Sequence, residues 1–234
     1  MSEHFLKLPF NFDIDKLNSE LVHVHPECWV AHQNRAAYEG DWFITSLKSV
    51  DGETTQILAV ENQEYKETPL LKKCTYIQDV INHFQTKVEA VRFMKLGANS
   101  SIKEHRDVGS CYEDGLVRIH IPITSNNKVV FTLDTKETQM QTGHCYYIDA
   151  DIPHSVVNNG DTDRVHLLID CHVNDWFKEV FKKAGYLEQK RKYSEKSIND
   201  DNVNEIIESL VVMNTKTSLQ TAERLKNERD NHVE

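Results

Sequence analysis

The spacing of hydrophobic residues changes along the chain, and these changes predict where the secondary structure changes. Before residue 90, two sets of apolar residues each share one helical face: Ile14, Leu17 and Leu21, and then Ile77, Val80, Ile81, Phe84 and Val88. Residues 29–56 between them are rich in aromatic and β-branched side chains and carry turn signals at Gly40-Asp41 and Asp51-Gly52. We therefore expect two helices that flank irregular strands and loops.

The pattern changes to a period of two between residues 90 and 171, which is typical of strands. Glycine, asparagine and aspartate separate the segments, and the predicted strands are residues 91–96, 116–124, 128–133, 145–149, 154–158 and 164–171. Several short strands at this spacing favour a sandwich or barrel of the cupin or jelly-roll kind. The expected fold class is therefore mainly β with flanking helices.

The chain becomes helical again after Val173. Apolar residues at helical spacing form a strong stripe and then a weaker one: Val203, Ile206, Ile207, Leu210 and Val211, then Leu219, Ala222 and Leu225. Asn202 and Glu205 have the spacing of a capping box in front of the strong stripe. We expect a domain of residues 1–176 and a C-terminal helical extension of residues 177–234. The strong stripe either docks on its own domain, which is favoured, or makes a homodimer contact.

Composition narrows the choice of partners. The 234 residues are 39% hydrophobic and 27% charged, as in an ordinary folded domain, and the net charge of −10 argues against nucleic acid as a partner. No run of about 18 apolar residues suggests a membrane span, and the N-terminus is unlike a secretory signal. The five cysteines are scattered without C-x-x-C spacing, so we expect reduced thiols in a cytoplasmic protein.

Two of the predicted strands have one apolar face and one largely polar face. In residues 116–124 the polar face carries Arg118 and His120, and in residues 164–171 it carries Arg164, His166, Leu168 and Asp170. Because both strands place an Arg-x-His opposite an apolar face, we expect them to line a polar pocket. Asp170 is eligible as a ligand, but its place on the strand favours orienting a neighbouring side chain.

Three separated motifs carry the candidate chemistry. They are His105-Arg106-Asp107, His154 directly after Pro153, and Arg164. Two imidazoles and one carboxylate make up the facial triad that holds non-haem Fe(II) with open coordination positions. An arginine adds a planar cationic fork that suits a carboxylate co-substrate. Each motif alone is weak, but in combination they predict an oxygenase.

These motifs resemble the aspartyl/asparaginyl β-hydroxylase family of Fe(II)/2-oxoglutarate oxygenases and, more distantly, free L-proline 3-hydroxylase. The similar stretches are Gly97-Ala98, His105-Arg106-Asp107, Arg118-Ile119-His120-Ile121-Pro122-Ile123, Gly143, Pro153-His154-Ser155-Val156-Val157-Asn158 and Asp163-Arg164-Val165-His166. In one respect the chain departs from the animal protein hydroxylase of this family, which has glycine at the position of Asp107. A carboxylate here completes the metal triad.

The resemblance implies a double-stranded β-helix and a role for each site residue. The Fe(II) ligands, and thus the catalytic residues, would be His105, Asp107 and His154. Arg164 would pair with the distal carboxylate of the co-substrate 2-oxoglutarate, and O2 would be the second co-substrate. Arg118 and His120 match family positions that support the co-substrate or the substrate carboxylate, and with His166 they are the residues expected to support 2-oxoglutarate beside Arg164.

The substrate is expected to be a small molecule, namely an amino acid or a derivative of one. Arg92, on the strand that leads toward His105, is either the partner of a substrate carboxylate or a surface arginine. Trp42 is a second candidate for substrate binding, although core packing also explains it. Two alternatives stay open: hydroxylation of an Asp or Asn side chain in a peptide or protein, and a non-catalytic cupin-like binding module.

Overall fold

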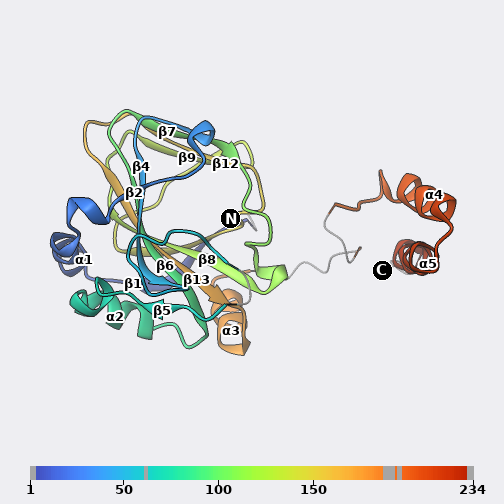
Figure 1. The fold of residues 1–234 in the computed structure, drawn as a ribbon, viewed down its shortest axis with the longest axis horizontal. Helices are drawn as coiled ribbons and strands as arrows, with labels where there is room; N and C mark the ends of the chain where they lie inside the picture. Colours follow the sequence, from blue (N-terminus) through green and yellow to red (C-terminus); the bar gives the residue numbers. More distant parts are fainter. Residues whose placement is uncertain (1–3, 61–62, 187–192, 194–196, 231–234) are drawn as a thin grey trace. The chain divides into compact units, whose positions relative to one another are not determined.

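The computed structural model describes residues 4–60, 63–186, 193 and 197–230, and Figure 1 shows their arrangement. The chain divides into two compact units, Met1–Leu187 and Glu188–Glu234. The first unit contains two β-sheets with helices beside them, and the second contains two helices. No helix in the described part of the chain is both long and apolar enough to cross a membrane.

Two antiparallel sheets make up the first unit. The larger sheet has the strand order β1 (Phe5–Asn11), β11 (His144–Ile148), β8 (Leu116–Thr124), β13 (Arg164–His172), β6 (Val88–Leu96), β4 (Trp42–Ser49) and β2 (Val30–Ala31), and β5 (Lys66–Glu67) pairs with β4. The smaller sheet has the order β10 (Lys136–Thr138), β9 (Val129–Leu133), β12 (His154–Asn158), β7 (Ser100–His105) and β3 (Tyr38–Glu39).

The strands from β6 to β13 have the connectivity of a jelly roll. In the larger sheet they follow the order β11-β8-β13-β6, and in the smaller sheet the order β10-β9-β12-β7. Consecutive strands therefore pass back and forth between the two sheets, except at the β9–β10 hairpin. This is the double-stranded β-helix expected from the sequence, and the prediction of a mainly β fold with flanking helices is confirmed.

The outer face of the larger sheet forms the main hydrophobic core. Val117, Ile119, Ile121 and Ile123 of β8 are at most 1% exposed, and the alternate residues of β13 pack beside them, as the period-two pattern predicted. Three helices supply the other side of this core (Figure 1): α1 (Ile14–Glu20), α2 (Thr75–Asn82) and α3 (Asp175–Lys183). Because this face is buried by helices, the opposite face of the sheet is free to line a site between the sheets.

Short 3-10 helices join several of these elements. They span Leu21–His23, Pro26–Cys28, Arg35–Ala37, Leu71–Lys73 and Tyr112–Asp114. The last one lies in the connection from β7 to β8, a few residues after His105 and Asp107 of the candidate metal triad.

Most predicted strands are confirmed, but the structure corrects several details. Strands β1, β7 and β10 were missed, and neither β7 nor β10 has the apolar alternation that marks a strand. The helix predicted through Val88 ends at Asn82, and Val88 begins β6 instead. Phe84 is buried nonetheless, since the turn after α2 directs it into the same core.

The second unit contains α4 (Val203–Met213) and α5 (Lys216–Asp230), which confirms both predicted helices. Their apolar stripes pack on each other, with Val203, Ile207, Ala222 and Leu225 buried. The predicted capping box is wrong: the side chain of Asn202 caps no helical N–H, and its Oδ1 accepts from the backbone of Asn199. Docking of α4 on the first unit and a homodimer contact both stay predictions.

Candidate active site

Three predicted ligands meet at the end of the smaller sheet. His105 is the last residue of β7, and His154, the first of β12, lies opposite it in the antiparallel register. Asp107 follows β7 in a turn, where its backbone N–H donates to the carbonyl oxygen of Ala150 at 2.8 Å. The potential ligand atoms of His105, Asp107 and His154 lie within 4.8 Å of one another.

Both imidazoles are oriented by the backbone of their own strand ends. Nδ1 of His105 is 2.8 Å from the carbonyl oxygen of Lys103, and Nδ1 of His154 is 3.0 Å from that of Ile152. A carbonyl oxygen only accepts hydrogen bonds, so each Nδ1 carries the proton and each Nε2 keeps its lone pair. That is the tautomer a metal ligand needs.

The charges around the triad favour the protonation states that bind metal. Burial lowers the pKa of His154 below its usual value, which favours the neutral imidazole. Burial alone would raise the pKa of Asp107, but the charges of Arg118, His154 and His105 outweigh it, and the net shift is downward. A neutral imidazole and a carboxylate are the forms that coordinate a metal. The donor set therefore fits a divalent transition metal such as Fe(II).

A second group of predicted residues lies on the inner face of the larger sheet. Arg164, His166 and His120 are 4%, 3% and 6% exposed. Nη2 of Arg164 donates to Nδ1 of His166 at 2.7 Å, while the buried Nε of Arg164 has no hydrogen-bond partner. Burial lowers the pKa of Arg164 to about 9, and burial together with the charge of Arg164 lowers the pKa of His120 and His166 well below the usual value.

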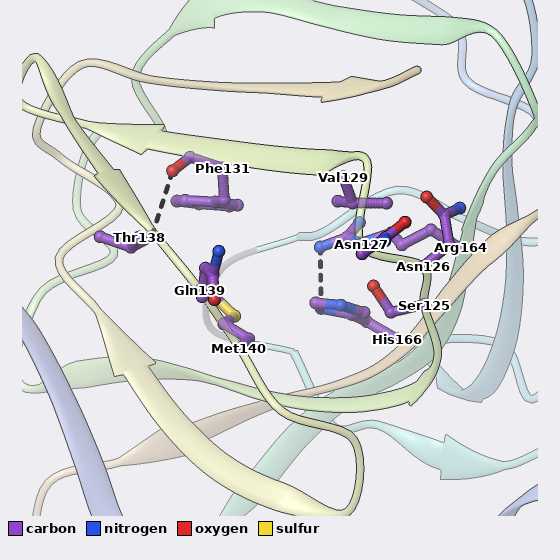
Figure 2. A pocket seen from close by; sticks show the side chains of 10 residues that line it. All are labelled: Ser125, Asn126, Asn127, Val129, Phe131, Thr138, Gln139, Met140, Arg164 and His166. Carbon is purple, nitrogen blue, oxygen red and sulfur yellow. Dashed lines mark hydrogen bonds between the residues drawn. The ribbon is translucent and has the colours of Figure 1, made fainter. Parts of the chain in front are cut away.

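Arg164 and Phe131 each line two cavities. The metal cavity, which we define by the triad residues lining it, has a volume of about 50 Å³ and is also lined by Arg118, His120 and Arg164. A larger cavity of about 300 Å³ is lined by Arg164, Phe131 and His166, and also by Asn127, Thr138 and Gln139. Figure 2 shows the guanidinium of Arg164 above the ring of His166, with Phe131 and Thr138 across this larger cavity.

Arg118 lies between two carboxylates on the same inner face. Its Nη1 donates to Oδ2 of Asp107, and its Nε and Nη2 donate to the two carboxylate oxygens of Asp170 at 2.8 and 3.3 Å. The expectation that Asp170 orients a neighbouring side chain is therefore confirmed. Burial opposes the charge of Arg118, but Asp170 and Asp107 raise its pKa above the ordinary value.

Of the two predicted substrate residues, one lines the metal cavity and the other lies outside it. Trp42 lines the metal cavity, with its ring centroid 6.1 Å from that of His105, and it stacks on His32 at 3.7 Å. Arg92 does not line this cavity but is buried at 7% exposure behind Asp170, with Nη2 4.0 Å from Oδ2 of Asp170. No hydrogen bond in the described part of the chain satisfies this Nη2. Arg92 is therefore not the surface arginine that its sequence context left open.

Sequence reasoning missed the apolar residues that shape the metal cavity. Phe131 stacks on His154 with the two rings 8° from parallel and also meets the ring of His120 edge-on. The other apolar lining residues are Met94, Ile102, Ile148, Ala150, Val156 and Leu168. Residues 128–133 were predicted as a strand, but no local pattern indicates that Phe131 meets a metal ligand.

Comparison with known proteins identifies relatives of this chain. Its sequence matches the family described as Aspartyl/Asparaginyl beta-hydroxylase over residues 12–173. It is also 28% identical over 174 residues to an L-proline cis-4-hydroxylase of Rhizobium meliloti (strain 1021). That match covers 73% of this chain and 61% of the relative, so it spans less than two thirds of the relative's length.

Solved structures show weaker similarity. A 2OG-Fe(II) oxygenase family oxidoreductase from Burkholderia pseudomallei superposes with a TM-score of 0.47 at 10% identity, covering 68% of this chain and 78% of that one. A viral collagen prolyl hydroxylase from Paramecium bursaria Chlorella virus-1 gives a TM-score of 0.43 at 7% identity, covering 72% and 96%. The family match itself covers most of the chain and every strand from β2 to β13. The chain therefore belongs to the aspartyl/asparaginyl β-hydroxylase family.

Proposed function

We propose that this protein is an Fe(II)- and 2-oxoglutarate-dependent dioxygenase that hydroxylates an amino acid or an amino-acid-derived small molecule. The observation that carries the proposal is the metal cavity, where His105, Asp107 and His154 meet and Arg164 is buried in the same wall. A triad of two histidines and one carboxylate leaves coordination positions open for co-substrates. Membership of the β-hydroxylase family supports the same chemistry.

In this proposal Arg164 binds the distal carboxylate of 2-oxoglutarate. A buried guanidinium with one unpartnered nitrogen is costly on its own, and a carboxylate would satisfy it. His166 holds the guanidinium through Nη2, and His120 lies in the same wall of the metal cavity. Arg118 was also predicted to support the co-substrate, but Nε, Nη1 and Nη2 already contact carboxylates, so Arg164, His120 and His166 carry this part of the proposal.

The proposed reaction balances as one substrate C–H, O2 and 2-oxoglutarate giving substrate C–OH, succinate and CO2. Bound iron would supply the oxygen chemistry, as a cofactor does. The chain's own residues would hold the co-substrate through Arg164 and keep water out with the apolar walls of Phe131, Ile148 and Val156.

An amino acid is the proposed substrate class, and two features support it. The relative that matches at 28% identity is an L-proline cis-4-hydroxylase, whose name refers to a free amino acid. Trp42 lines the metal cavity, with its ring centroid 6.1 Å from that of His105. We assign Trp42 to a wall of the substrate site, whereas Arg92 lies outside this cavity behind Asp170 and carries no part of the proposal.

An anaerobic titration tests the proposal. The apo-protein receives Fe(II) and then 2-oxoglutarate, and the visible charge-transfer band of the ternary complex is followed. We expect the band in the wild type and in Arg224→Ala, whose arginine lies on α5 in the second unit. Arg164→Ala should still bind Fe(II) but need far more 2-oxoglutarate.

Absence of the band in correctly folded wild-type protein would refute the oxygenase function and favour a non-catalytic cupin-like module. If the band appears, succinate release stimulated by free amino acids, compared with peptides containing Asp or Asn, identifies the substrate class. Stimulation by the peptides alone would contradict the amino-acid assignment.

A further inference from the structure

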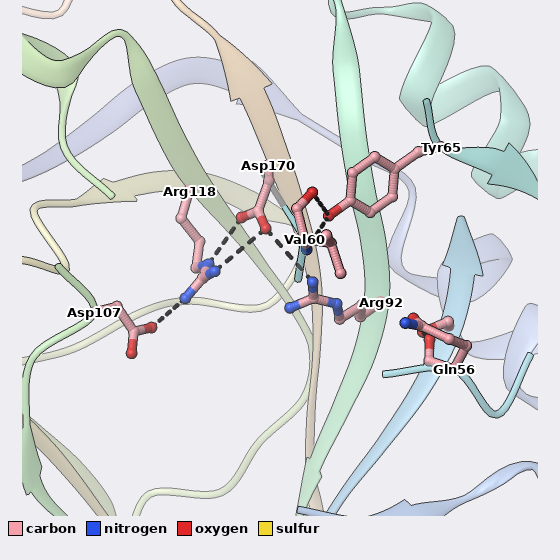
Figure 3. A network of polar contacts seen from close by, with 8 residues as sticks. Gln56, Val60, Tyr65, Arg92, Asp107, Arg118 and Asp170 are labelled. Atoms are coloured by element: carbon pink, nitrogen blue, oxygen red, sulfur yellow. Dashed lines mark hydrogen bonds and ion pairs between the residues drawn. The ribbon is translucent and has the colours of Figure 1, made fainter. Parts of the chain in front are cut away.

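A row of alternating charges runs from the metal cavity into the larger sheet. Figure 3 shows Asp107, Arg118, Asp170 and Arg92 in this order. Arg118 on β8 and Asp170 on β13 are direct partners in the antiparallel register, which places their side chains on the same face. The two carboxylates balance the two guanidinium groups. Removal of any one member would therefore leave the row with a net charge, and removal of Arg118 or Asp170 would also separate the remaining members.

Asp107 presents its two oxygens to different partners. Oδ2 accepts the hydrogen bond from Nη1 of Arg118, whereas Oδ1 is 3.9 Å from Nε2 of His105. Since Nε2 of His105 is the nitrogen available to a metal, Oδ1 is the oxygen on the metal side of the carboxylate. Arg118 is thus hydrogen-bonded to Oδ2, whereas the contact with His105 is made by Oδ1.

Asp170 keeps Arg118 in this position. It accepts from Nε and Nη2 through both of its oxygens, which is the two-pronged geometry that fixes a guanidinium plane. With that plane fixed, Nη1 alone points to Asp107. The side chains of Arg118 and Asp170 are only 13% and 8% exposed, so water competes little for the hydrogen bonds between them.

We propose that Arg118 is a positioning residue that holds Asp107 as a single-oxygen metal ligand, with Asp170 as its anchor. The inference rests on the proposed function, because it assumes that the triad binds a divalent metal. By occupying Oδ2, Arg118 prevents Asp107 from chelating the metal through both oxygens. A coordination position is thereby kept open for a co-substrate. This role differs from binding the co-substrate or the substrate carboxylate, which the family resemblance implied for Arg118.

The two roles for Arg118 predict opposite results in a binding experiment. Co(II) replaces Fe(II) as the probe, and its visible spectrum reports both affinity and coordination number. We expect Arg118→Lys and Asp170→Asn to bind Co(II) about 10- to 100-fold more weakly than the wild type, as is typical when a partner of a metal ligand is lost. We also expect their Co(II) spectra to change, because both oxygens of Asp107 become available. With Co(II) saturating, the affinity for 2-oxoglutarate should stay within threefold, or about 0.7 kcal/mol.

The control is Glu89→Gln, which weakens the contact of Glu89 with His172 on the same sheet, in neither cavity. It should leave both affinities and the Co(II) spectrum unchanged. Circular dichroism and thermal unfolding check that each variant is folded, and Asp170→Asn keeps the test possible if Arg118→Lys fails to fold.

Wild-type Co(II) affinity and spectrum in both folded variants would overturn the positioning role, whatever their affinity for 2-oxoglutarate. Weakened 2-oxoglutarate binding in Arg118→Lys would then favour co-substrate binding instead. Failure of the wild type itself to bind Co(II) would refute the proposed function instead, so the two failures are distinguishable.

Discussion

His105 and His154 lie opposite each other on neighbouring antiparallel strands, with their ring centroids 4.2 Å apart. Each ring directs Nδ1 to the carbonyl oxygen two residues before it, so both present Nε2 in the same way. The two imidazoles therefore depend on the pairing of β7 with β12 rather than on the loops beside them. Any change that shifts this register would separate them.

The first prediction concerns this pair of ligands. His105→Ala and His154→Ala should each weaken Co(II) binding by at least about 100-fold, since loss of a ligand should cost no less than loss of its supporting partner. The double variant should lose less Co(II) affinity than the product of the two single fold-changes, because loss of one ligand already destroys the site. Isothermal titration measures the affinities. His144→Ala, on β11 outside both cavities, should bind as the wild type does. Tight binding in both single variants would place the metal elsewhere.

The second prediction concerns Phe131, which is 4% exposed and contacts His154 and His120. Phe131→Ala should lower the free energy of unfolding by about 3–5 kcal/mol, because it removes a buried ring and joins the two cavities. Phe131→Leu should cost less, since much of the wall remains. Urea unfolding of the apo-protein measures both. Val22→Ala, at a position 76% exposed, should change stability by no more than about 0.5 kcal/mol. A small loss of unfolding free energy in Phe131→Ala would contradict this prediction and show that neighbouring side chains move in to fill the space left by the ring.

The third prediction concerns pH. His120 and His166 are buried with their pKa values well below the ordinary 6.5, so the unfolded chain takes up protons near pH 6.5 while the folded chain does not. The unfolded state then binds more protons, and the free energy of unfolding falls as the pH drops below about 6.5, by at most about 1.4 kcal/mol per pH unit for each histidine.

Urea unfolding with a chelator present, at several pH values between 7.5 and 5, measures this slope. His166→Gln should flatten it, and His25→Gln, at an exposed position, should not. Equal slopes in the wild type and His166→Gln would show that His166 is protonated in the folded state.

The fourth prediction compares two glycines with nearly equal backbone conformations. Gly143 and Gly115 have φ of +77° and +81°, a region that side chains disfavour. An added Cβ at Gly115 meets nothing within 4 Å, whereas at Gly143 it lies 2.8 Å from the carbonyl oxygen of Phe12. Gly115→Ala should cost about 1–2 kcal/mol. Gly143→Ala should cost about 1–3 kcal/mol more, because the backbone must move. Thermal unfolding measures which variant loses more stability. Equal losses would show that the backbone at Phe12 can move aside at little energetic cost.

Local patterns predicted most strands but not all of the site. Period-two alternation identified β8 and β13 and correctly divided their faces, since alternation depends only on the pleat of one strand. The same rule missed β7, because its exposed and polar positions follow no alternation. The helix α2 ended earlier than predicted, since a buried Phe84 continues the helical spacing beyond the last helical turn.

The sequence by itself determined the chemistry that is available: two histidines and an aspartate in short motifs, a distant arginine, and strands with one polar face. Only the tertiary structure decided which of these groups meet. The pairing of β7 with β12 brings His105 to His154, and the pairing of β8 with β13 gives Arg118 the partner Asp170 and directs it to Asp107. Burial in the same structure leaves Arg164 with an unsatisfied nitrogen. The physical reason is that alternation is a property of a single strand. Register, burial and the choice between charge partners depend on strands that are distant in the sequence.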